Sequence, residues 1–323
     1  MFDSILLEKG EKMKDIKIVF MGTPSFAANV LEGILSKYSV SLVVCQPDNE
    51  RNRKGDIIYS PVKELAIRNN IEVFQPLKIR KDYERIVEVH PDLIITCAYG
   101  QIIPKALLDL PRLGAINVHG SILPKLRGGA PIHHALIDGY DKTGVTVMYM
   151  NEKMDAGDII ATREILIDDN EYLDSLYEKM SFLGRDLLLD TLPSIINGTN
   201  VRIKQREDEV TFGLNVTKEE EKIDFTKKTR DIFNLIRGLN SNPGAYAYLE
   251  NKRIKIFRTE ILNKKYDGEN GEIVDITKDG IIIKTCDGAL KILEIQLEGK
   301  KKTLVRDYLN GIKGTDLIGI VLK

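Results

Sequence analysis

Tryptophan is absent from this 323-residue sequence, and cysteine and histidine are scarce, with three and four copies. Three scattered cysteines cannot form a disulfide framework, so they indicate a reducing compartment, and we expect the cytoplasm. None of them has metal-ligand spacing to another cysteine or to a histidine, and we therefore expect no metal site. No apolar run approaches the roughly 20 residues of a membrane-spanning helix, so we also expect no membrane partner.

Strong net charge is lacking as well, because 47 lysine and arginine residues nearly balance 48 aspartate and glutamate residues. The balance differs between the two parts of the chain. Residues 1–200 contain 23 basic and 28 acidic residues, whereas residues 201–323 contain 24 and 20. This asymmetry favours a polyanionic partner that reaches the second part, although ordinary surface variation also produces differences of this size.

Short β-rich runs alternate with amphipathic runs through the first two thirds of the sequence. This alternation predicts an α/β fold with a Rossmann-like, mostly parallel sheet and helices on both faces. Two runs, near 145–150 and 158–167, predict antiparallel additions to that sheet. After about residue 240, several short β-rich runs follow one another, which is typical of a small, OB-like β-barrel.

These patterns divide the chain into four parts. Residues 1–12 precede the first strand pattern and form an extension, and residues 13–200 form the first domain. Residues 201–217 are polar and rich in turn-forming residues, which predicts a linker. Residues 218–323 carry the short β-rich runs and form the second domain. In a parallel sheet, ligands bind beyond the carboxyl ends of the strands, so we expect the functional loops there.

A glycine follows the first strand pattern, as in dinucleotide-binding folds, but the rest of that fingerprint is missing. Pro24 and Ala27 occupy the positions of the second and third glycine. Without those glycines the backbone cannot approach a pyrophosphate closely. We therefore expect a simple strand-to-helix turn that lines a cleft.

The segment INVHGSILPKLRGGAPI, from Ile116 to Ile132, combines residue types that neither a core strand nor a packed helix needs. Asn117 and His119 are two residues apart at a predicted strand end, so they project on the same side. Asparagine supplies a neutral amide donor, and histidine accepts or donates a proton near neutral pH. The pair can hold a developing oxyanion and move a proton. Considered singly, Asn117 could instead cap a turn and His119 could be an interior histidine.

Features that follow this pair in the sequence strengthen the interpretation. Pro124 stiffens the loop, where a cis peptide bond is compatible with the turn, and the pair Gly128–Gly129 lets the backbone turn tightly beside a ligand. Farther along the chain, Asp155 precedes a small-residue turn, where its carboxylate can face His119 and orient the imidazole. Without His119 as a partner, Asp155 would be interpreted as an ordinary turn residue.

Three segments together resemble the folate-dependent formyltransferase family, and most closely its members that act on methionyl-tRNA. They are MGTPSFA, AYGQIIPKALLDLPRLGAINVHGSILPKLRGGAPI and TGVTVMYMNEKMDAGDII. In the second domain, KEEEKIDFTKKTRDIFNLIRGLNSNPGAYAYL and GALKILEIQLEGKKK are similar to the family's tRNA-binding domain. The resemblance implies transfer of a formyl group from 10-formyltetrahydrofolate, a co-substrate, to the α-amine of methionyl initiator tRNA, and hence a part in translation initiation.

The resemblance also implies roles for individual residues and domains. Asn117, His119 and Asp155 match the family's catalytic residues. A folate-contacting segment matches four residues: Ser121, Ile122, Leu123 and Pro124. By the same resemblance, the first domain is catalytic and the second binds tRNA. We expect charged initiator tRNA and a folate as partners of a monomeric enzyme.

The sequence departs from the family's pattern at two places. LNSNPGAY lacks the aromatic residue that the family carries in LNPWPGAY. The loop after VVCQP is short and keeps three basic residues: Arg51, Arg53 and Lys54. Because this trio follows the carboxyl end of a predicted strand, we expect it to contact tRNA phosphates, although a solvated surface loop has the same composition.

Two other functions fit parts of the sequence. A folate-dependent N-formyltransferase acting on an amino sugar nucleotide or on glycinamide ribonucleotide would use the same loop, but so small an amine does not require the lysine-bearing second domain. A hydrolase of formyltetrahydrofolate, or a catalytically silent folate- or RNA-binding protein, is the other alternative. Silent binding does not need Asn117, His119 and Asp155 together.

Overall fold

The computed structural model describes residues 13–48, 50–51, 55–311 and 314–323. The predicted extension over residues 1–12 lies outside them. The chain forms two compact units, each assembled from segments that are separate in the sequence. The first unit contains the described residues up to 125, and residues 144–164 and 178–210. The second contains residues 126–143, 165–177 and the described residues from 211 to 323.

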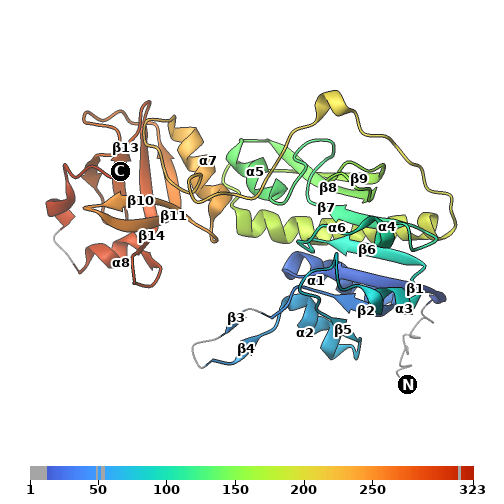
Figure 1. Ribbon diagram of the computed structural model, residues 1–323. Coiled ribbons are helices and arrows are strands. Elements are labelled where there is room, and N and C mark those ends of the chain that lie inside the picture. The colour runs from blue at the N-terminus through green and yellow to red at the C-terminus, as the bar shows by residue number, and fades with distance from the viewer. Residues whose placement is uncertain (1–12, 49, 52–54, 312–313) are drawn as a thin grey trace, which may run out of the picture. The chain divides into compact units, whose positions relative to one another are not determined.

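A seven-stranded sheet forms the centre of the first unit, in the order β5-β2-β1-β6-β7-β8-β9 (Figure 1). Neighbouring strands from β5 to β7 are parallel, and β7 and β8 are antiparallel. This arrangement confirms the predicted, mostly parallel sheet. The strands are β1 (Met13–Gly22), β2 (Tyr38–Val44), β5 (Val73–Phe74), β6 (Leu93–Cys97), β7 (Ala115–His119), β8 (Lys142–Tyr149) and β9 (Ile159–Leu166).

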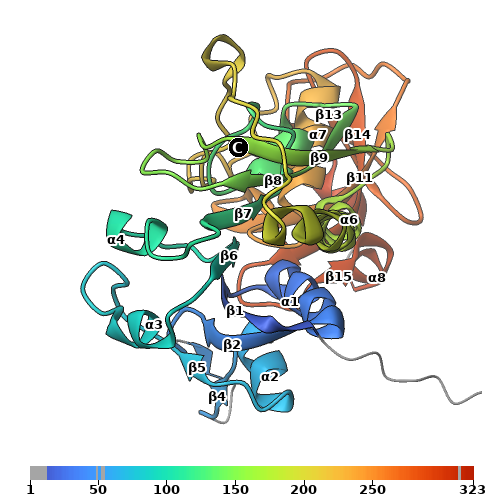
Figure 2. The ribbon, with the colours of Figure 1, turned by 90° about the vertical axis from the view of Figure 1, so that its right-hand side faces the viewer.

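Helices cover both faces of this sheet, as Figure 2 shows. On one face, Ile94 of β6 belongs to the same buried apolar cluster as Ile86 of α3 and Leu107 of α4. On the other face, α6 packs so closely on β7 that a Cβ added at Gly184 would lie 3.0 Å from Val118. The helices are α1 (Ser25–Lys37), α2 (Pro61–Arg68), α3 (Glu84–Val89), α4 (Lys105–Leu108) and α6 (Leu173–Ile196), of which α6 begins in the second unit.

Antiparallel strands form the second unit, in the order β10-β11-β14-β13-β12, with β15 paired to β14. The strands are β10 (Ala245–Leu249), β11 (Lys252–Leu262), β12 (Ile273–Ile276), β13 (Ile281–Lys284), β14 (Ala289–Leu297) and β15 (Thr303–Leu304). The accompanying helices are α5 (Pro131–Ile137), α7 (Thr229–Leu239) and α8 (Val305–Leu309), with short 3₁₀ helices at Glu207–Glu209, in the first unit, and Gly314–Leu317.

The last residues of the chain join the two edge strands of this sheet. The Ile273 N–H donates to the carbonyl of Ile320 at 2.8 Å, and the backbones of Tyr248 and Lys323 bond in both directions at 2.7 and 3.0 Å. Residues 319–323, the closing segment, therefore lie between β12 and β10. This closure confirms the predicted small β-barrel.

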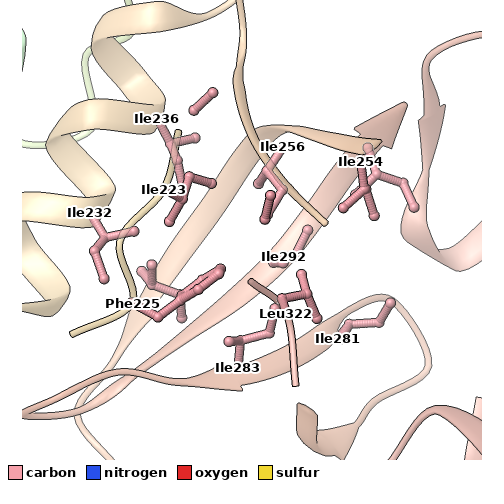
Figure 3. Close-up of a cluster of buried hydrophobic side chains, with 14 of the residues drawn as sticks. Ile223, Phe225, Ile232, Ile236, Ile254, Ile256, Ile281, Ile283, Ile292 and Leu322 are labelled. Atoms are coloured by element: carbon pink, nitrogen blue, oxygen red, sulfur yellow. The ribbon is translucent and has the colours of Figure 1, made fainter. Parts of the chain in front are cut away.

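The interior of the barrel is almost entirely aliphatic (Figure 3). Ile232 and Ile236 of α7 face Ile256 and Ile292 of the sheet, and Leu322 of the closing segment belongs to the same cluster. Such burial stabilises by roughly 25 cal/mol for each Å² of apolar surface removed from water. Ile232 and Ile236 of α7 thus pack against the apolar interior of the barrel, where they are removed from water.

Polar contacts hold the segment LNSNPGAY, where the resemblance predicts an aromatic residue. The Asn240 side chain donates to the carbonyl of Phe257 at 2.6 Å. The backbone N–H and the hydroxyl of Ser241 both bond to the carboxylate of Asp174, at 3.2 and 3.3 Å. Hydrogen bonds within the second unit therefore fix this segment without a large ring.

Candidate active site

Asn117 and His119 lie at the carboxyl end of β7, two residues apart. Alternation along the strand places them on the same face of the sheet as Ala115, which belongs to the cluster under α3 and α4. His119 is 5% exposed, and Asn117 is half-buried. Both side chains thus occur where a parallel sheet presents its ligand site, as predicted from their position at a strand end.

Asp155 lies in the turn between β8 and β9, and the fold brings its carboxylate to the imidazole of His119. The distance from His119 Nδ1 to Asp155 Oδ1 is 3.7 Å. This exceeds a hydrogen bond, but catalytic contacts are often long before a substrate binds. The geometry directs Nδ1 toward the carboxylate.

The backbone of Asp155 is held in an uncommon conformation by a segment 50 positions along the chain. Its φ angle is +47°, in the left-handed region that residues other than glycine seldom adopt. Nε2 of Gln205 donates to the carbonyls of Asp155 and Gly157, both at 2.8 Å. Ile203 also exchanges two backbone hydrogen bonds with Ile159, at 2.8 and 2.9 Å. Residues 200–205, which we call the strap, therefore hold the turn that carries Asp155.

Thr96 is a further polar residue of this region. It is 3% exposed, and its hydroxyl donates to Oδ1 of Asn117 at 2.8 Å. Neither Thr96 nor Gln205 is among the residues predicted from the sequence. A threonine in the apolar run LIITC at a strand end was an available signal for the first. No signal marked Gln205, which lies in a polar, turn-rich segment.

The predicted folate-contacting segment follows β7 directly. Ser121 and Leu123 are buried, at 1% and 4% exposure, and Ile122 and Pro124 are half-buried. The hydroxyl of Thr146 donates to the Ser121 carbonyl at 2.7 Å and accepts from the Leu123 N–H at 3.2 Å. The peptide bond between Leu123 and Pro124 is cis. Thr146 of β8 therefore holds the loop, and the side chains of Ile122 and Pro124 stay partly exposed.

Arg51 lies in a two-stranded ribbon, the only described member of the basic trio. The ribbon pairs β3 (Glu50–Arg51) with β4 (Ile57–Ile58) in antiparallel register. Arg51 is exposed, and its guanidinium donates to the carbonyl of Gly55 at 2.7 Å. Arg53 and Lys54 lie outside the described residues, so the grouping of the trio stays a prediction.

Cysteine chemistry does not contribute to this site. Cys97 follows Thr96 and is fully buried, and burial raises the pKa of its thiol. A thiolate nucleophile is thereby disfavoured. Cys45 is buried as well, as predicted for a small apolar residue in a strand. Within the described ranges, no group of three or more His, Cys, Asp or Glu side chains is arranged to hold a metal ion.

Two family models match the chain. The formyl transferase model matches residues 16–192, and the model of the formyl transferase C-terminal domain matches residues 215–313. Together with the parallel sheet and the polar group at the end of β7, these matches define a formyl transferase.

A curated relative specifies the family further. The methionyl-tRNA formyltransferase of Staphylococcus aureus strain MW2 is 45% identical over 306 residues, which cover 94% of this chain and 98% of the relative. The chain therefore belongs to the methionyl-tRNA formyltransferase family.

Solved structures share the fold. An N-formyltransferase from Helicobacter canadensis, solved with folinic acid and dTDP-3-aminofucose, superposes with a TM-score of 0.67 at 21% identity, covering 89% of this chain and 100% of that chain. HypX from Aquifex aeolicus, solved with tetrahydrofolic acid, gives a TM-score of 0.62 at 20% identity, covering 91% of this chain and 47% of that chain. Across the described parts of the chain, no helix is both long and apolar enough to cross a membrane.

Proposed function

We propose that this enzyme transfers the formyl group of 10-formyltetrahydrofolate to the α-amine of methionyl initiator tRNA. The observation that carries the proposal is that Asn117 and His119 lie at the carboxyl end of β7, and that the carboxylate of Asp155, in the turn after β8, lies 3.7 Å from the His119 imidazole. The 45% identity to a methionyl-tRNA formyltransferase over nearly the full length of both chains supports the choice of substrate.

The reaction needs no metal ion and no strong base. An α-amine has a pKa near 7.7–8.0, so an appreciable fraction is a free nucleophile in the cell. The amine nitrogen attacks the formyl carbon, and the electron pair of the carbonyl moves onto its oxygen. The intermediate collapses when the bond between the formyl carbon and the folate nitrogen breaks. One proton passes from the amine to the departing nitrogen, so charge and atoms balance.

Asn117 and His119 divide this chemistry between them. The amide N–H₂ of Asn117 donates to the formyl oxygen as negative charge develops, and one such preorganised donor is worth about 10²–10³ in rate. His119 takes the proton of the attacking amine through Nε2 and delivers it to the leaving nitrogen. The Asp155 carboxylate favours the tautomer with a proton on Nδ1 and so keeps Nε2 available.

The binding surfaces follow from the same assignment. The loop of Ser121, Ile122, Leu123 and Pro124 contacts the folate through its backbone and through its half-buried side chains. The basic trio of Arg51, Arg53 and Lys54 contacts tRNA phosphates. We assign residues 13–200 to the catalytic domain, 201–217 to the linker and 218–323 to the tRNA-binding domain. The enzyme acts as a monomer in the cytoplasm.

A formyl-transfer assay tests the proposal. Purified full-length enzyme is supplied with 10-formyltetrahydrofolate and one of three acceptors: methionyl initiator tRNA, an amino sugar nucleotide, or none. We expect formylation of the charged tRNA alone. Transfer to the sugar nucleotide but not to tRNA would overturn the assigned substrate. Release of formate without an acceptor, at the rate seen with tRNA, would instead establish a hydrolase.

A further inference from the structure

Thr96 and Asn117 are direct neighbours across two parallel strands. They are register partners in the pairing of β6 with β7. Besides its 2.8 Å contact with Asn117 Oδ1, the Thr96 hydroxyl lies 3.2 Å from the Ile116 carbonyl and 3.2 Å from Met150 Sδ. A hydroxyl has a single proton, and the contact with Asn117 Oδ1 is the shortest of the three, so we assign the proton to it.

We infer that Thr96 is a positioning residue that fixes the orientation of the Asn117 carboxamide. A carboxamide has an acceptor oxygen and a donor nitrogen, and a half-turn of the side chain exchanges them. The Thr96 hydroxyl binds the oxygen and thereby leaves the nitrogen for the substrate. In the opposite orientation, the amide oxygen would face the formyl oxygen, and two partial negative charges would repel each other. This inference rests on the proposed function, because it requires Asn117 to bind the formyl oxygen.

Thr96 lies among buried residues of its own strand. The next residue of β6 is the buried Cys97, and the strand pattern around Thr96 is buried throughout. A net hydrogen bond inside a protein shifts an equilibrium by roughly 2- to 12-fold. Removing the hydroxyl keeps the catalytic donor but lets both orientations form. We therefore expect a loss of turnover smaller than the loss caused by removing Asn117 itself.

A double-mutant cycle tests the inference in the full-length enzyme. Thr96→Val removes the hydroxyl at nearly constant shape, Thr96→Ser keeps it, and each is combined with Asn117→Ala. Turnover and KM are measured with 10-formyltetrahydrofolate and methionyl-tRNA. We expect Thr96→Val to lower kcat about 3- to 10-fold with both KM values nearly unchanged. Thr96→Ser should remain close to the original enzyme, and Thr96→Val should change kcat less than twofold in the Asn117→Ala background.

Several outcomes decide the matter. An unchanged kcat in Thr96→Val would overturn the inference, and so would an equal loss with and without Asn117, because a merely structural role produces that result. An impaired Thr96→Ser would overturn it too, and this variant carries the test if Thr96→Val does not fold. A fully active Asn117→Ala would instead refute the catalytic role of Asn117, and with it the proposed mechanism.

Discussion

At the scale of single residues, the site separates three tasks among three side-chain types. A neutral amide holds negative charge without becoming ionised, an imidazole exchanges a proton, and a carboxylate orients the imidazole. His119 is 5% exposed, whereas the Asp155 side chain is 17% exposed, so the imidazole is the more sheltered member of the pair. Sheltering of this kind strengthens electrostatic interactions at the reacting atoms.

Replacement of His119 by alanine is expected to remove most of the turnover. Proton transfer by a positioned side chain contributes about 10²–10⁴ in rate, so kcat should fall by that factor. Binding of the folate, measured by calorimetry, should persist because the loop after β7 keeps its own hydrogen bonds. His90→Asn is a suitable control, since asparagine tolerates the left-handed φ of +53° at that position. Near-normal turnover of His119→Ala would refute its assignment.

At the scale of elements, part of the predicted linker belongs to the strap and holds the turn that carries Asp155. Besides the bonds of Ile203 and Gln205, the Arg202 guanidinium stacks on the ring of Tyr149 at 3.8 Å. The Tyr149 hydroxyl donates to Asn200 at 3.2 Å. A Cβ at Gly157 would lie 1.8 Å from the Tyr149 carbonyl oxygen, so the turn requires glycine there. The strap and β8 thus confine the Asp155 turn from two sides.

Substitution of Gln205 by methionine tests this confinement. The change keeps the length of the side chain but removes both hydrogen bonds to the Asp155 turn, each worth roughly 0.5–1.5 kcal/mol. We expect kcat to fall about 3- to 30-fold and the KM for tRNA to stay the same. Gln296→Met is a matched control, because Gln296 donates to the Lys300 carbonyl at 2.9 Å in another turn. Equal effects of the two substitutions would argue against a role for the strap.

The basic residues in the sequence between β2 and α2 are predicted to bind tRNA. Replacing Arg51, Arg53 and Lys54 by alanine should weaken tRNA binding. It should also reduce the slope of log K against log salt concentration by about 2–3, since each phosphate contact contributes roughly 0.7–0.9 to that slope. Binding measured at several salt concentrations checks this. A triple alanine variant of another exposed basic group, Lys78, Arg80 and Lys81, serves as control. If the affinity and the slope do not change, the assignment of these three residues to tRNA binding is wrong.

At the scale of the whole molecule, each unit is assembled from distant parts of the chain. The second unit takes in α5 and residues 165–177 in addition to the barrel. Helix α5 packs on α7, where a Cβ at Gly238 would lie 2.7 Å from Ile137. The barrel itself depends on the closing segment, which hydrogen-bonds the backbone of Tyr248 in β10 and of Ile273 in β12. A sheet closed in this way presents no free edge between β10 and β12.

Truncation of Leu322 to alanine should therefore destabilise the barrel. Leu322 is 4% exposed within the apolar cluster, and comparable core truncations cost about 2–5 kcal/mol. Denaturant unfolding, followed by spectroscopy, measures the loss. Leu166→Ala, at a side chain that is 77% exposed in the same unit, should change the free energy of unfolding by less than about 0.5 kcal/mol. Similar losses for both would contradict the role of the closing segment.

The sequence alone was sufficient for the features that depend on local pattern. Alternating strand and helix periods predicted the parallel sheet, and successive short β-rich runs predicted the barrel. The spacing of Asn117 and His119 placed both on one side of a strand end, because side chains alternate along a strand. The resemblance in the long segment around them then predicted the family, and the comparisons confirmed it.

The contacts between residues that are far apart in the chain follow from the folded structure and not from the sequence pattern. The register of β6 and β7 places Thr96 against Asn117, and the strap brings Gln205 to a turn 50 residues earlier. The closing segment reaches β10 and β12 across more than 40 residues. No local pattern encodes such pairs, because strand register and chain closure are settled by the packing of the whole sheet.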